Sequence, residues 1–272
     1  MGDPRDAFDR EAFGLDGRVA ALTGGGSGIG KATALTLARA GASIVVADID
    51  EAGAQNTADE ITAAGGTASV VRTDVTNRAD IDALVDTTME RHGRLDVMGN
   101  IAGVPYNNMV SDTPDDDLEK ILAINLKGVW YGCQAAMRVM VPQGSGSIIN
   151  LSSGAIDTPA PTLALYGMTK AAVAQLTKVL AMEAGRSGIR VNALAPGIIE
   201  TNFSRQHFVD EEGEVDPERL EKYRKNFGRM APLQRVGTPQ DVANAIWWLV
   251  SDASGFVTGQ IERPNGGVAM PW

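Results

Sequence analysis

The chain has 272 residues, 44% of them hydrophobic, which is enough for the core of one large domain or two small ones. Its 24 basic and 34 acidic residues give a formal net charge of −10, which argues against nonspecific binding to nucleic acid or to an anionic membrane. The single cysteine, Cys133, excludes an intramolecular disulfide and is expected to be a packed thiol. The two histidines, His92 and His207, have no ligand spacing, so we predict no metal site.

The ends of the chain and its apolar runs bear on location. No apolar run approaches the roughly 18 residues that a membrane-spanning helix needs, and the first residues contain no apolar signal segment. We therefore predict a cytoplasmic protein without a membrane partner. Residues 1–15 are charged and aperiodic, and we expect them to form an N-terminal arm.

The first elements are a strand, a glycine turn, a helix and a second strand. Residues 18–22 form a short apolar run that leads into Thr23-Gly-Gly-Gly-Ser-Gly-Ile-Gly30. A helical pattern covers residues 31–40 and stops at a glycine, a residue favoured just past a helix end. A second apolar run, residues 43–47, ends at Asp48.

Strands and helices continue to alternate along the rest of the chain. The later predicted strands are residues 67–72, 95–98, 148–151, 190–195 and 259–263, and the predicted helices include residues 80–92, 115–141, the stretch that follows Leu163, and 238–250. This alternation predicts an α/β fold, a doubly wound parallel sheet of about seven strands with helices on both faces.

Residues 198–237 interrupt this alternation. They contain one good helix, residues 216–227, in which Asp216 can act as the cap and Leu220, Tyr223 and Phe227 form an apolar stripe. A charged excursion with a single apolar stripe predicts a small helical lid over a binding site.

A hydroxyl, a phenol and an ammonium lie close together in the middle of the chain. Ser153 follows the apolar strand at residues 148–151, and Tyr166 and Lys170 are four apart on the next helix, hence on one helix face. A nearby ammonium favours the phenolate and so lowers the pKa of a tyrosine from about 10. We predict Tyr166 as the proton carrier, Lys170 as the group that tunes it, and Ser153 as a donor to the reacting oxygen.

The glycine turn and Asp48 together predict a dinucleotide site. Glycines after a first strand let the backbone approach a pyrophosphate, which rests on the amino end of the next helix. Asp48 lies 18 residues after Gly30, at the end of the second strand, where a carboxylate accepts the ribose hydroxyls and repels a 2′-phosphate. We therefore expect NAD(H) rather than NADP(H).

Several motifs resemble those of the short-chain dehydrogenase/reductase family, in its single-domain branch. Thr23-Gly24-x-x-x-Gly28-x-Gly30 is similar to the family's glycine motif, and Ser153 lies 13 residues before Tyr166, the usual interval. Asn100-Ile-Ala-Gly103 resembles its Asn-Asn-Ala-Gly motif, with isoleucine in place of the second asparagine. The resemblance extends over roughly residues 16–267. Near its end, Pro264-Asn265 departs from the common Val-Asp, and the proline is expected to shorten the last strand.

The resemblance implies a Rossmann-type fold, a single domain over residues 1–272, and hydride transfer between a nicotinamide and a secondary alcohol or ketone. It adds Asn125 to Ser153, Tyr166 and Lys170, as the anchor of a water that extends the proton relay. The residues expected to bind the cofactor, besides Tyr166 and Lys170, are Gly24, Ser27, Gly28, Ile29, Gly30, Asp48, Asp74, Val75, Asn100, Ala102, Gly103, Pro196, Gly197, Ile199 and Thr201.

Three other interpretations compete with this one. A 3-oxoacyl-carrier-protein reductase would share the chemistry. The resemblance links such enzymes to NADPH and to a basic patch that binds the acidic carrier, and Asp48 argues against NADPH. An inactive dinucleotide-sensing relative would be expected to lose one of the three catalytic side chains, and none is lost. A nucleotide-sugar epimerase of the longer branch would carry a larger carboxyl-terminal domain.

The substrate and the assembly are less strongly specified. The candidate substrate-contacting residues favour a mostly apolar small molecule; they are Val104, Pro105, Tyr106, Ile156, Pro159, Phe203, Phe208 and Tyr223. The stretches 129–141 and 171–182 are apolar nearly all round, more than packing on one sheet requires, so we expect a homotetramer or homodimer.

Overall fold

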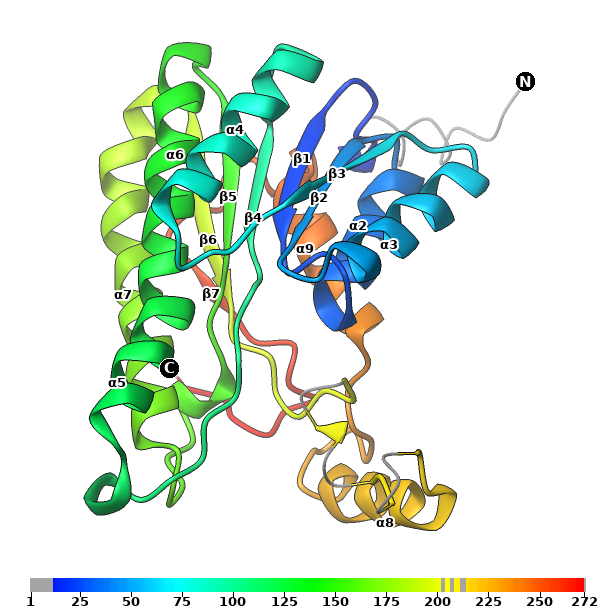
Figure 1. Ribbon diagram of the computed structural model, residues 1–272, viewed down its shortest axis with the longest axis vertical. Helices are drawn as coiled ribbons and strands as arrows, with labels where there is room; N and C mark the ends of the chain where they lie inside the picture. The colour runs from blue at the N-terminus through cyan, green and yellow to red at the C-terminus, as the bar shows by residue number, and fades with distance from the viewer. Residues whose placement is uncertain (1–11, 202–203, 206–207, 211–213, 272) are drawn as a thin grey trace.

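The computed structural model describes residues 12–201, 204–205, 208–210 and 214–271 (Figure 1). Its strands are β1 (Val19–Thr23), β2 (Ser43–Asp48), β3 (Ala68–Arg72), β4 (Val97–Asn100), β5 (Gly146–Leu151), β6 (Ile189–Leu194) and β7 (Ile261–Glu262). Its α-helices are α2 (Gly28–Arg39), α3 (Glu51–Ala63), α4 (Arg78–His92), α5 (Asp115–Leu122), α6 (Gly128–Gln143), α7 (Ala164–Ala184), α8 (Pro217–Gly228) and α9 (Pro239–Val250).

The seven strands form one sheet in the order β3-β2-β1-β4-β5-β6-β7, and every pair is parallel. The predicted doubly wound sheet is confirmed. The order reverses between β1 and β4, so the crevice beyond the carboxyl ends of these two strands is where such sheets bind ligands.

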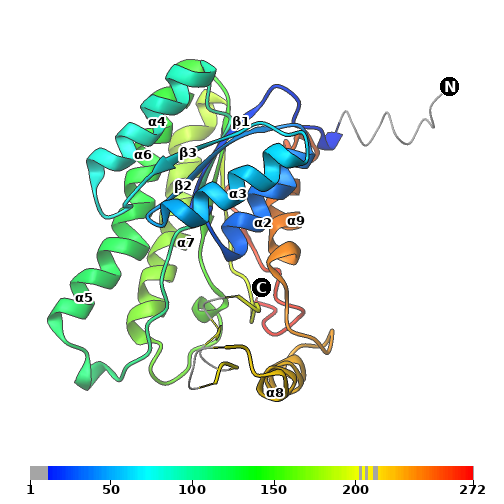
Figure 2. The same ribbon diagram turned by 45° about the vertical axis from the view of Figure 1, so that its right-hand side comes forward.

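Helices cover both faces of the sheet (Figures 1 and 2). Helices α2, α3 and α9 pack on one face, and α4, α6 and α7 pack on the other. Alternate side chains of β1 divide between the two layers, with Ala20 and Leu22 in the first core and Ala21 in the second. This two-sided burial explains why the strands are continuous apolar runs in the sequence.

The long helical pattern at residues 115–141 is not one helix. The structure has α5, then a π-helical turn over Ala123–Lys127, then α6. The apolar periodicity continues through the turn, so the sequence gives no sign of it. A π turn adds one residue to the helical spacing and turns the next side chains toward a different direction.

The last strand is shorter than the sequence pattern indicated. β7 contains only Ile261 and Glu262, and it pairs with Ala193 and Leu194 of β6. Pro264 has no N–H to continue the ladder, as expected. At the other end of the chain, Leu15 of the predicted arm is fully buried and its N–H donates to the carbonyl of Ala40, while residues 1–11 lie outside the described residues.

No helix among the described residues is long and apolar enough to cross a membrane.

Candidate active site

The predicted catalytic residues lie at the carboxyl end of β5 and the start of α7. Ser153 begins a 3₁₀ turn, Gly154–Ile156, and its hydroxyl accepts a hydrogen bond from the N–H of Ala155 at 3.2 Å. A hydrogen bond also joins the side chains of Ser153 and Tyr166. Lys170, one turn after Tyr166, has its Nζ 5.8 Å from the centroid of the phenol ring. The structure thus brings all three side chains together.

Burial governs the ionisation of this cluster. Burial raises the pKa of Tyr166, and the hydrogen bond with Ser153 acts against that increase. The net direction is opposite to the lowered pKa that the sequence predicted from Lys170, because removing a phenolate from water outweighs the local help. Burial also lowers the pKa of Lys170 from 10.5 to about 8, and its Nζ donates to the carbonyl of Leu151 at 2.8 Å.

Asn125 belongs to the π turn and is fully buried. Its side-chain amide makes two hydrogen bonds to the backbone of Val104: Oδ1 accepts from the Val104 N–H and Nδ2 donates to the Val104 carbonyl, each at 2.9 Å. A Cβ added to Gly103 would lie 3.2 Å from Asn125 Oδ1 and 3.3 Å from Lys170 Nζ. Asn125 and Lys170 therefore border the same small space.

The glycine turn between β1 and α2 has the geometry of a phosphate site. Gly24 and Gly28 have φ of +69° and +50°, values that favour glycine, and a Cβ on Gly30 would lie 1.9 Å from the Gly24 carbonyl oxygen. Ser27, the N-cap of α2, makes no side-chain hydrogen bond to the helix end. The N–H groups there are available for an anion, as at other helix amino ends that bind phosphate.

Asp48, the last residue of β2, faces the glycine turn. Its Oδ2 accepts from the N–H of Gly26 at 2.9 Å and its Oδ1 from the N–H of Asp50 at 3.0 Å. Each carboxylate oxygen has a second lone pair for a hydroxyl donor. The residues present thus fit a dinucleotide, with the diphosphate at the turn and a ribose at Asp48.

The segment after β6 closes over the same turn. A Cβ added to Gly28 would lie 3.6 Å from Thr201 Cγ2, which places Thr201 beside the helix start. The carbonyl of Pro196 accepts a hydrogen bond from the N–H of Gly154 at 2.8 Å. The segment after β6 therefore also contacts residues 153–157, which we call the serine turn. Ile199 is buried in the same core as Leu22 of β1, and its side chain packs against Gly237, where an added Cβ would lie 2.4 Å from Ile199 Cδ1.

Two further predicted positions flank the crevice at β3. Asp74 Oδ1 accepts from the N–H and the hydroxyl of Thr76, at 2.9 and 2.7 Å. Val75 packs against Gly128 at the start of α6, where a Cβ would be 2.9 Å from the Val75 Cβ. Both lie on the loop that follows β3.

Asn100, one of the residues predicted to bind the cofactor, is the last residue of β4. Its side chain is turned into the core, where Nδ2 donates to Asn150 Oδ1 at 2.9 Å. The residue that does organise this loop is Thr23, whose Oγ1 accepts from the N–H groups of Ile101 and Ala102 at 3.1 and 3.2 Å. In the sequence, the only indication of this role is that a residue with a hydroxyl, Thr23, ends the first strand. Because Thr23 holds the backbone of this loop, the isoleucine at position 101, where the family motif has asparagine, leaves the loop without a need for another side-chain donor.

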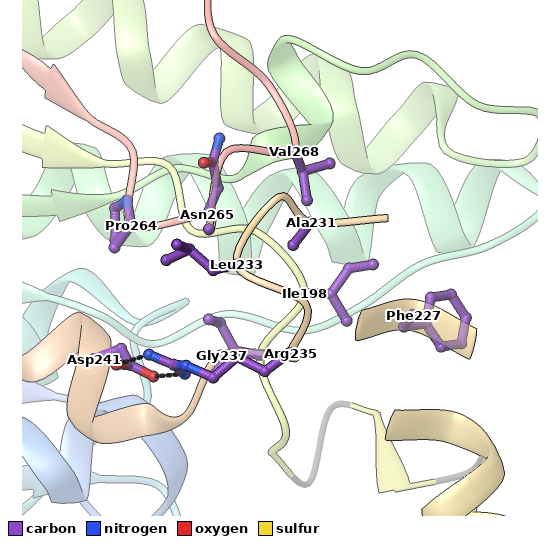
Figure 3. A pocket seen from close by; sticks show the side chains of 12 residues that line it. Ile198, Phe227, Ala231, Leu233, Arg235, Gly237, Asp241, Pro264, Asn265 and Val268 are labelled. Carbon is purple, nitrogen blue, oxygen red and sulfur yellow. Dashed lines mark hydrogen bonds and ion pairs between the residues drawn. The ribbon is translucent and has the colours of Figure 1, made fainter. Parts of the chain in front are cut away.

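The lid side chains differ from the predicted substrate contacts. Phe208 and Tyr223 are buried together with Val236, and their rings are 5.3 Å apart, so they form the core of the lid. Phe203 lies outside the described residues. A pocket of about 210 Å³ separates the end of the lid from the C-terminal segment (Figure 3). It contains Ile198, Leu233 and Asn265 but none of the predicted catalytic residues.

Two residues near the site were missed by the sequence analysis. Arg263, just after β7, makes a bidentate ion pair with Asp157 on the serine turn.

Among the described residues, no group of three or more histidine, cysteine or acidic side chains is placed to hold a metal ion.

The fold and the glycine turn place the chain among the dinucleotide-binding α/β oxidoreductases. A family model described as "Enoyl-(Acyl carrier protein) reductase" matches residues 24–269. The chain is 36% identical to the short chain dehydrogenase/reductase astE of Aspergillus oryzae, over 96% of this chain and 98% of that protein. It therefore belongs to the short-chain dehydrogenase/reductase family.

Solved structures agree. The chain resembles a 7α-hydroxysteroid dehydrogenase in complex with NADH and 7-oxo-glycochenodeoxycholic acid, with a TM-score of 0.86 and 34% identity over 96% of this chain and 98% of the other. It also resembles a gluconate 5-dehydrogenase from Burkholderia cenocepacia in complex with NADP and tartrate, with a TM-score of 0.86 and 35% identity over 95% and 98%. The chain is a nicotinamide-dinucleotide-dependent oxidoreductase that acts on hydroxyl and keto groups.

Proposed function

We propose that this chain is an NAD(H)-dependent oxidoreductase of a mostly apolar secondary alcohol or its ketone. The observation that carries the proposal is the hydrogen bond between the side chains of Ser153 and Tyr166, with Lys170 on the adjoining turn of α7. A phenol paired with a hydroxyl beside a buried amine is a proton-transfer site.

The four side chains have different parts in the reaction. Tyr166 takes the substrate hydroxyl proton during oxidation and returns it during reduction, at its phenolic oxygen. Ser153 donates to the substrate oxygen and orients it. Lys170 binds ribose hydroxyls and favours the phenolate, and Asn125 holds the water that continues the relay. The bound dinucleotide supplies the hydride acceptor or donor and, when oxidised, a positive charge near the phenol. Burial raises the pKa of Tyr166, and this added charge would act in the opposite direction.

Asp48 supports NAD(H) as the cofactor. Its carboxylate is fixed by the N–H groups of Gly26 and Asp50 and stands at the end of β2. A 2′-phosphate there would meet a negative charge at close range, whereas two ribose hydroxyls would each find an acceptor. The dinucleotide would be held by the positions named above, with Asn100 acting only through the fold of its loop.

The lid and the loop after β4 support an apolar substrate. Met109 and Val110 are exposed on that loop, and the Asn108 N–H donates at 3.0 Å to the carbonyl of Thr162, in the segment that leads into α7. We propose residues 198–237 as the lid: among its described residues, Phe208, Tyr223 and Val236 form a small core that is separate from the two cores of the sheet. Residues 1–272 form one domain on this proposal.

The outer faces of α6 and α7 support a homodimer, or a homotetramer built from such dimers. Trp130 and Val141 of α6, with Met168, Val179 and Met182 of α7, are all exposed apolar side chains. Exposed apolar side chains on two helices that pack against each other are typical of a protein interface.

A second candidate is a 3-oxoacyl-carrier-protein reductase. The description of the matching family model names an acyl carrier protein, and the exposed Lys222 and Lys225 on α8 suit an acidic partner. Glu218 and Glu221 lie one turn before these lysines and reduce the net charge of the surface, so the lid is a poor docking site for an acidic carrier. The dinucleotide-sensing alternative is disfavoured because Ser153, Tyr166 and Lys170 are all present and adjacent.

One panel tests these proposals. Steroid, cyclic and medium-chain secondary alcohols and their ketones, and a β-ketoacyl thioester, are assayed with NAD(H) and with NADP(H). We expect turnover of an apolar alcohol with at least a tenfold preference for NAD⁺, and loss of that preference in Asp48→Ala. A strong preference for NADP(H) would remove Asp48 from its role, and activity only on the thioester would favour the second candidate.

A further inference from the structure

The ion pair between Asp157 and Arg263 connects the C-terminal end of the sheet to the serine turn. Arg263 Nε donates to Asp157 Oδ2 at 2.6 Å, and Arg263 Nη2 donates to Asp157 Oδ1 at 3.1 Å. The two residues are 106 positions apart in the sequence. The third nitrogen donates to the carbonyl of Ile261 at 2.6 Å, which fixes the guanidinium to β7. The side chain of Asp157 is only 11% exposed, so the pair is well shielded from water.

The serine turn also packs against α7 and is held by backbone hydrogen bonds. Its near end is held by the hydrogen bond from the Gly154 N–H to Pro196. Within the turn, the N–H groups of Asp157 and Thr158 both donate to the Gly154 carbonyl at 3.0 Å. Residues 158–160 beyond it are exposed. The Asp157 carboxylate is therefore the side-chain tether at the far end of the turn that begins with Ser153.

The same C-terminal segment also contacts the loop after β6 and the end of the lid. The Gly197 N–H donates to the Pro264 carbonyl at 3.3 Å, and a Cβ added to Gly197 would lie 2.8 Å from the Asn265 Cα. The Leu233 N–H, at the end of the lid, donates to the Gly266 carbonyl at 3.2 Å. Figure 3 shows Pro264 and Asn265 beside Leu233 in this arrangement.

We propose that Arg263 is a positioning residue for Ser153: its ion pair with Asp157 fixes the turn so that the serine hydroxyl meets Tyr166. Arg263 touches neither substrate nor dinucleotide, and it acts only through the turn. Misplacement of a catalytic group by about 1 Å costs on the order of a hundredfold in rate. This inference rests on the proposed function, because it needs the Ser153–Tyr166 pair to be catalytic.

The test is a double-mutant cycle with Ser153. We expect Arg263→Ala to lower kcat by roughly ten- to a hundredfold with an unchanged Kd for the dinucleotide. In a Ser153→Ala background the same substitution should cost nothing further, because the group that it positions is gone. Arg263→Lys retains the cation with one contact instead of two, and its kcat should lie between those of the wild type and Arg263→Ala. If Arg263→Ala does not fold, Arg263→Lys replaces it in the double-mutant cycle with Ser153→Ala.

Arg94 offers a matched control. It makes the same two-pronged pair with a nearly buried aspartate, Asp96, both contacts at 2.7 Å, at the amino end of β4 and away from the site. Arg94→Ala should lower stability while leaving kcat unchanged. The inference is overturned if Arg263→Ala keeps full kcat, or if it lowers kcat equally with and without Ser153. If Ser153→Ala itself leaves turnover intact, the proposed function fails instead.

Discussion

Tyr166 and Lys170 are both driven by burial toward their uncharged forms. Burial raises the pKa of the phenol and lowers that of the ammonium to about 8. An amine that releases its proton near pH 8 is suited to relay a proton, because a general acid–base group works best with its pKa near the operating pH. The hydrogen bond from Ser153 acts in the other direction, because it stabilises the phenolate and so lowers the pKa of Tyr166.

Removal of the Tyr166 hydroxyl isolates its chemistry. We expect Tyr166→Phe to lower kcat by at least about a hundredfold, the scale of a general acid–base contribution. The Kd for the dinucleotide, measured by fluorescence titration, should change by less than about twofold because the phosphate and ribose contacts remain. Tyr131→Phe, on α6, is the control for loss of a tyrosine hydroxyl elsewhere. Retained turnover in Tyr166→Phe would refute the assigned role.

The buried Lys170 ammonium makes stability depend on pH. Its folded pKa of about 8 lies below the ordinary 10.5, so the unfolded chain binds more protons between these two values. Stability is therefore reduced below about pH 8, and the loss is recovered as the pH rises toward 10.5. The shift corresponds to roughly 3 kcal/mol in total.

Replacing this lysine by Met tests that sign. In urea unfolding without dinucleotide, Lys170→Met should gain stability relative to the wild type at pH 7 compared with pH 10. Lys178→Met, an exposed lysine on the same helix, is the control and should show no such difference. A Lys170→Met effect that is equal at both pH values would show that the ammonium carries no burial penalty.

At the residue scale, the local motifs were predictable and the long-range pairs were not. The spacing of Ser153, Tyr166 and Lys170 follows from one strand and one helix, so the sequence contains it. The pair of Asp157 with Arg263 joins residues 106 apart and depends on β7 lying next to β6. The inward turn of Asn100 depends on Asn150, a residue of the neighbouring strand. No periodicity encodes such contacts.

At the scale of elements, helix ends follow their capping residues closely. Asp216 accepts from the N–H groups of Glu218 and Arg219 to begin α8, as the sequence indicated. Thr238 and Asp241 form a reciprocal capping box at the start of α9. The π turn had no such signal, because its cause is the tertiary demand that Asn125 reach Val104.

The capping box gives a stability prediction. Thr238→Ala removes the Oγ1 that accepts from the Asp241 N–H, and we expect a loss of about 1 kcal/mol in the free energy of unfolding. Thr62→Ala, within α3, deletes the same atoms without a cap and should be neutral or slightly stabilising. Denaturant unfolding of both variants measures the difference, and equal effects would show that the box contributes nothing.

At the scale of the whole molecule, the alternation of strands and helices was sufficient to predict the sheet and the edge at which the site lies. It could not predict which helix faces stay uncovered, because a buried face and an interface face have the same composition. The structure separates them. α7 buries Val173, Thr177 and Leu180 against the sheet, while Met182 on its other side is 84% exposed.

This outer face of α7 yields the last prediction. We expect light scattering to give two or four times the 28.6 kDa of one chain, since a stable interface buries about 800 Å² per partner. Val179→Glu combined with Met182→Glu places two charges on that face and should produce a smaller species. Val215→Glu, an exposed apolar residue beside α8, is the control and should leave the mass unchanged. Because the same helix carries Tyr166 and Lys170 near its amino end, the dissociated variant should also lose turnover. A wild-type monomer at micromolar concentration would contradict the predicted interface.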